Sequence, residues 1–193
     1  MNRKMKQSVP RVCALLLTIF VLSGCATPGD DSERANRAVD DGNAEVEAGK
    51  KLSEEGLAKY MEAFDFEEST GSSSDWEDRK QPAREAIDLL GKAVERFRKA
   101  ADKFEEASKL RVDEKFKQYL SLKTQGLRKR AEQVEVVRNI PEMLLDESIK
   151  DSKSLLPKID EANERSQRLG KESEELESQA EKIRLENAHL FTS

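Results

Sequence analysis

Apolar residues recur every three or four positions along most of the chain, which is the spacing of one face of an α-helix. The most regular run reads Ala83, Ala86, Leu90, Ala93, Phe97, Ala100, Phe104 and Ala107. Steps that alternate between three and four residues indicate a heptad seam like that of a coiled coil. A second seam runs from Ile159 to Leu190, but Ser166, Ser173 and Asn187 take some of its positions. We expect this last helix to pack weakly at those levels, and to be partly open or paired with another protein.

Breaks in the pattern set the expected helix ends at about 32–66, 76–110, 112–139 and 141–190. A serine-rich cluster at 69–74 separates the first two segments, and Pro141 follows the third. Pro157 is expected to kink the chain or to open the final helix. In the third segment a charged residue, Lys123, interrupts the seam formed by Val112, Phe116, Leu120, Leu127, Ala131, Val134 and Val137.

The chain lacks the alternation of apolar and polar residues that marks β-strands. We therefore predict an all-α fold, either an elongated antiparallel bundle or a set of long helical hairpins with coiled-coil-like seams.

Small residues form a stripe on the first predicted helix at intervals of seven: Ala35, Gly42, Gly49, Gly56 and Ala63. A glycine inside a helix costs about 1 kcal/mol relative to alanine, so the three glycines need a compensating gain. Close approach of a second helix would supply it, and we predict close packing at Gly42, Gly49 and Gly56. The alternatives are a deliberately loose helix and a groove kept open for a partner.

The N-terminus has a different pattern. Basic residues Arg3, Lys4, Lys6 and Arg11 precede an apolar run of about 11 residues, from Val12 to Leu22, which ends at Ser23 and Gly24. This order is typical of a secretory signal, and the run is shorter than the roughly 20 residues that span a bilayer. We predict a signal peptide over 1–24, a short polar linker over 25–30 and a helical domain over 31–193.

The residues Leu22, Ser23, Gly24 and Cys25 at the end of the apolar run resemble the lipobox of bacterial lipoproteins. This resemblance implies that Cys25 carries a covalent diacylglyceryl group, that the signal is cut just before it, and that the new amino terminus carries an N-acyl chain. Two or three chains would hold the protein to a membrane almost permanently. Because the next residue is Ala26 and not aspartate, the resemblance also implies the periplasmic face of the outer membrane. In a Gram-positive host, the same signal would imply the outer face of the plasma membrane.

Charge narrows the choice of partner. Loss of the four basic residues of the signal changes the formal net charge from −5 to −9, which argues against a nucleic acid. The segment from Lys92 to Arg130 is the exception, with 13 basic and 6 acidic residues. We interpret it as a solvated helix face, with a polyanion site as the alternative.

No residue pattern indicates catalysis, a metal site or a cofactor other than the lipid. Cys13 lies in the signal, Cys25 is predicted to be lipidated, and His189 has no second histidine to share a metal. The carboxylates of Glu172, Glu174 and Glu175 fit a solvated helix surface. Trp76, the single tryptophan, is interpreted as packing under a loop, with a binding hot spot as the alternative.

Three functions fit these features. The first is a non-catalytic envelope lipoprotein, a membrane-anchored scaffold or adaptor that binds other envelope proteins through helix faces. The second is a periplasmic carrier or chaperone for an apolar ligand or an unfolded outer-membrane protein. The third is a mechanical spacer, for which self-association would be the expected contact.

Overall fold

Four long helices make up nearly all of the structure, a computed structural model that describes residues 28–64, 73–146 and 152–191. These helices are α1 (Pro28–Ala63), α2 (Ser73–Ser108), α3 (Glu114–Leu144) and α4 (Ser152–Glu186), followed by the short 3-10 helix η1 (Ala188–Leu190). No strand occurs within these ranges. The predicted all-α fold of long antiparallel helices is confirmed.

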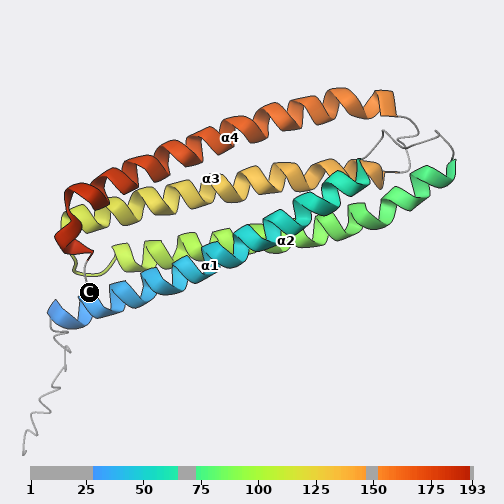
Figure 1. The fold of residues 1–193 in the computed structure, drawn as a ribbon. Coiled ribbons are helices and arrows are strands. Elements are labelled where there is room, and N and C mark those ends of the chain that lie inside the picture. The colour runs from blue at the N-terminus through green and yellow to red at the C-terminus, as the bar shows by residue number, and fades with distance from the viewer. Residues whose placement is uncertain (1–27, 65–72, 147–151, 192–193) are drawn as a thin grey trace, which may run out of the picture.

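The helices form an open array in which each one packs along its neighbours in sequence (Figure 1). α2 lies between α1 and α3, and α4 packs along the other side of α3. Within the described residues, α1 and α4 do not pack along each other, so the array is a series of hairpins and not a closed bundle. We call the end where α1 begins and α4 ends the proximal end, and the opposite end the distal end (Figure 1).

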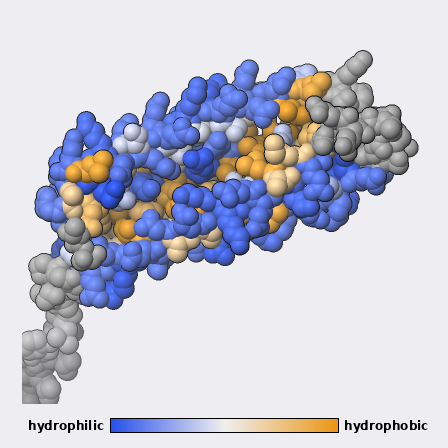
Figure 2. Space-filling view, in the orientation of Figure 1, coloured by the Kyte–Doolittle hydropathy of each residue, from blue (hydrophilic) through white to orange (hydrophobic). Residues whose placement is uncertain are grey.

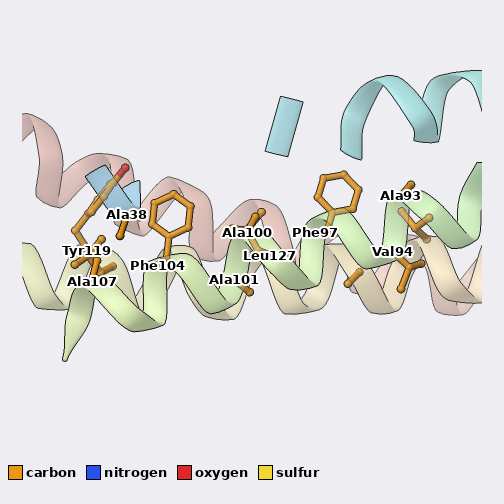
Figure 3. Close-up of a cluster of buried hydrophobic side chains, with 14 of the residues drawn as sticks. Ala38, Ala93, Val94, Phe97, Ala100, Ala101, Phe104, Ala107, Tyr119 and Leu127 are labelled. Atoms are coloured by element: carbon orange, nitrogen blue, oxygen red, sulfur yellow. The ribbon is translucent and has the colours of Figure 1, made fainter. Parts of the chain in front are cut away.

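The predicted heptad seam of α2 forms the centre of the core. Its alanines at 83, 86, 93, 100 and 107 are fully buried, as are Leu90 and Phe104, and Phe97 is 3% exposed. Phe97 and Phe104 point from α2 to the same side (Figure 3). α2 packs on both sides, against α1 and α3, which explains why its seam is the most regular in the chain.

A smaller apolar cluster closes the distal end. It contains Ala63 of α1 and Ala83 of α2, together with Ile140 and Leu144 of α3 and Leu155 and Ile159 of α4. Near the same end, Arg79 donates a hydrogen bond to the carbonyl of Ala63 at 3.0 Å, which satisfies one of the free carbonyls at the C-terminus of α1.

Contacts at the proximal end fix the chain in two places. The side chain of Asp31, only 6% exposed, accepts a hydrogen bond from Arg111 in the α2–α3 connection at 2.8 Å. Phe191 follows η1 and makes edge-to-face contacts with Phe116 and Tyr119 of α3, with ring centroids 5.2 and 4.9 Å apart. The ends of α1 and α4 are thereby tied to the central hairpin.

Several predicted helix ends were wrong. α1 begins at Pro28, so residues 28–30 belong to the helix and not to a linker; proline suits the first helical turn because its missing N–H has no partner there. α2 begins at Ser73, inside the serine-rich cluster that was expected to precede it, and ends at Ser108. α3 begins after Asp113, whose side chain accepts a hydrogen bond from the backbone N–H of Lys115 at 2.7 Å.

Both prolines of the second half lie inside helices. α3 continues through Pro141 to Leu144, because Ile140, Pro141 and Leu144 are buried and their burial offsets the cost of a proline in the last turn. α4 begins at Ser152, so Pro157 neither opens the final helix nor breaks it.

Candidate functional site

The glycine stripe of α1 lies directly against large side chains of α2. A Cβ atom added to Gly42 would lie 3.0 Å from the ring of Phe104, and one added to Gly49 would lie 3.0 Å from the ring of Phe97. At Gly56 it would lie 2.8 Å from Cγ of Leu90. The three partners on α2 are also seven residues apart, so large residues fit small ones at every second turn of an antiparallel pair. The stripe therefore makes the close helix packing that the sequence predicts.

Ion pairs on one flank of this interface agree with the same register. Arg96 donates two hydrogen bonds to Glu45, at 2.9 and 3.1 Å, and Lys59 lies 3.1 Å from Glu85. Ion pairs near the surface contribute little stability, typically about 0.2 to 1 kcal/mol, so the glycine contacts dominate the α1–α2 interface. The other flank of α1 lies beside a groove.

On that other flank, a row of residues seven apart is only partly buried: Val39, Val46, Ser53 and Tyr60. At the level of Ser53, a shallow groove opens between α1 and α3. It is lined by Ser53 and Leu57 of α1, Leu90 of α2, and Arg130, Gln133, Val134 and Val137 of α3. We call this the α1–α3 groove; Leu57, on its rim, is 40% exposed.

The surface view agrees with this description. Apolar residues gather in a band between the ridge formed by α3 and α4 and the ridge formed by α1, with hydrophilic residues on both outer flanks (Figure 2). Near the distal end the exposed apolar surface includes Met61, 70% exposed, and Leu156, 52% exposed. Exposed apolar surface that follows a groove is typical of an interaction surface.

One cation of α3, Arg130, lines the groove, and a second, Lys123, lies two turns before it on the same helix. Lys123 and Arg130 are seven residues apart, and both are half-buried. The ammonium of Lys123 lies 5.8 Å from the ring centroid of Phe104, the residue that packs on Gly42 of α1. Arg130 donates to the side-chain carbonyl of Gln133 at 3.0 Å. Neither cation forms an ion pair with a carboxylate in the part of the chain that the structure describes.

Two neighbouring cations of α3 form ion pairs with carboxylates of other helices. Arg128 pairs with Glu105 of α2, and Lys129 lies 2.8 Å from Glu172 of α4, whose hydrogen bond raises the pKa of the lysine. The pKa of Glu181 on α4 is lowered chiefly by its hydrogen bond with Arg184, and in smaller part by the charge of Lys123. Within the predicted basic segment, most cations thus form ion pairs with carboxylates.

α4 packs against α3, which forms one wall of the groove. Gly126 of α3 and Ser173 of α4 are both buried, and the hydroxyl of Ser173 donates to the carbonyl of Gly126 at 2.9 Å. Gln133 fits against Gly170 of α4, where an added Cβ would lie 2.7 Å from Nε2 of the glutamine. The α3 wall of the groove is therefore held between α2 and α4.

The other residues singled out from the sequence do not join the groove. The lipobox residues Leu22, Ser23, Gly24 and Cys25 lie outside the described residues, and so does the side chain of Trp76. Glu174 and Glu175 are exposed on α4, and His189 is exposed in η1. Across the described ranges, no group of three or more histidine, cysteine, aspartate or glutamate residues could hold a metal ion.

Sequence reasoning missed the groove, and it left the meaning of the charge at Lys123 open. Lys123 was noted as an interruption of an apolar seam, but the buried position at that level is taken by Thr124, 5% exposed. The threonine hydroxyl donates to the carbonyl of Leu120 at 2.9 Å, so a polar residue is satisfied locally inside the core. Lys123 is only partly buried beside it, with its ammonium 5.8 Å from the ring centroid of Phe104.

Comparison of the chain with protein-family models, with curated proteins and with solved structures finds no match. None of the described helices is both long and apolar enough to cross a membrane.

Proposed function

We propose that this chain is the precursor of a bacterial envelope lipoprotein, anchored by lipid on Cys25, whose helical domain is a non-catalytic scaffold or adaptor for other envelope proteins. The lipobox-like residues at 22–25 support the anchor. The observation that carries the adaptor role is the α1–α3 groove with its exposed apolar rim, because a face of this kind is suited to binding a protein segment.

The proposed anchor would also orient the molecule. α1 begins three residues after Cys25, and three trans peptide units reach at most about 11 Å. The proximal end would then lie close to the membrane surface. A helix of 36 residues extends about 54 Å, so the distal end with Met61 and Leu156 would face away from the membrane.

The same length favours a second candidate function, a mechanical spacer. α1, α2 and α4 each have at least 35 residues, and the array keeps them parallel to its long axis (Figure 1). A spacer needs length and stiffness, whereas an adaptor also needs a recognition surface. The groove favours the adaptor over the spacer.

Mild crosslinking in the native host, followed by purification and identification of the adducts, tests the proposal. An adaptor should give one or a few defined envelope proteins, and crosslinkers placed at Leu57 or Met61 should capture them more often than one placed at Lys92 on the exposed side of α2. Nascent outer-membrane proteins or lipid in the adducts would point instead to a carrier. Adducts that contain only this chain would support the spacer.

A further inference from the structure

We draw no further inference here: the strongest candidate, the exposed apolar surface at Met61 and Leu156 near the distal end of the array, belongs to the surface already described, and nothing in the described residues shows what covers it.

Discussion

At the scale of single residues, the fit of small on large side chains between α1 and α2 is the main determinant of the fold. Glycine lowers the stability of a helix relative to alanine, so packing contacts at these positions must compensate for the loss. The positions next to Phe104, Phe97 and Leu90 have no room for a side chain without movement of the neighbour.

Replacement of Gly49 by leucine should therefore destabilise the protein by about 1 to 3 kcal/mol, because the new side chain would collide with the ring of Phe97. Gly91→Ala is the matched control. A Cβ at Gly91 would meet only the side chain of Arg138, 3.7 Å away, so this variant should gain several tenths of a kcal/mol from helix propensity. Thermal melts can resolve the two, since 1 kcal/mol shifts the midpoint by roughly 2 to 4 °C in a domain of this size. A higher midpoint for Gly49→Leu would refute the close-packing interpretation.

Asp31 provides a pH-dependent contact at the start of α1. Its pKa lies below the ordinary 3.8, chiefly because Arg111 donates a hydrogen bond to it. A carboxyl whose pKa is lower in the folded state stabilises the fold above its unfolded pKa, and this contribution is lost as the pH falls through the folded value. Asp31→Asn should therefore lower the melting midpoint at pH 7, and the gap from wild type should close in acid, below about pH 3.8.

The control for this measurement is Glu33→Gln, on the same turn of α1. Glu33 pairs with Arg37, but its side chain is 68% exposed, so its loss should change the midpoint little at any pH. A gap between Asp31→Asn and wild type that is the same in acid as at neutral pH would show that the charge of Asp31 is not the cause.

At the scale of elements, the sequence predicts the helices well but not all of their ends. Heptad spacing identifies the buried seam of α2 residue by residue, although it misses both ends of the helix. Pro141 was taken as a helix boundary because the rule that proline ends a helix considers only local sequence. Burial of Ile140 and Leu144 against α1, α2 and α4 is a non-local effect, and it keeps α3 helical for another turn.

The seam of α4 contains small polar residues, which fits the position of this helix at the edge of the array. Ser166 and Ser173 were expected to weaken its packing, and both are buried against α3, where Ser173 bonds to the backbone of Gly126. Small residues of this kind allow close approach but bury little apolar area, so α4 is held less firmly than α2.

We therefore expect backbone amides in the middle of α4 to exchange with deuterium faster than those of α2. Phe191→Ala should speed exchange further in the last turns of α4 and in η1, because it removes the contacts with Phe116 and Tyr119. Exchange in the middle of α1 serves as the internal control and should not change. Equal rates of amide exchange in α2 and α4 would contradict the conclusion that α4 is held less firmly than α2.

At the scale of the whole molecule, the choice between a closed bundle and a series of hairpins could not be made from the sequence. A heptad seam shows that a face is buried, but it does not identify the helix that covers it. The groove between α1 and α3 follows from that choice, since a closed bundle would place α4 over it.

The proposed anchor connects this architecture to a membrane, and one measurement tests it most directly. Protein extracted with detergent from the native host is digested with trypsin, and the fragment Cys25–Arg34 is examined by mass spectrometry. We predict that this fragment begins at Cys25 and carries a diacylglyceryl group and an amide-linked acyl chain. A Cys25→Ser precursor should keep its signal and lose lipid. An unmodified Cys25 in the membrane-bound protein, or a Cys25→Ser variant that is processed and retained like the wild type, would contradict the lipoprotein account.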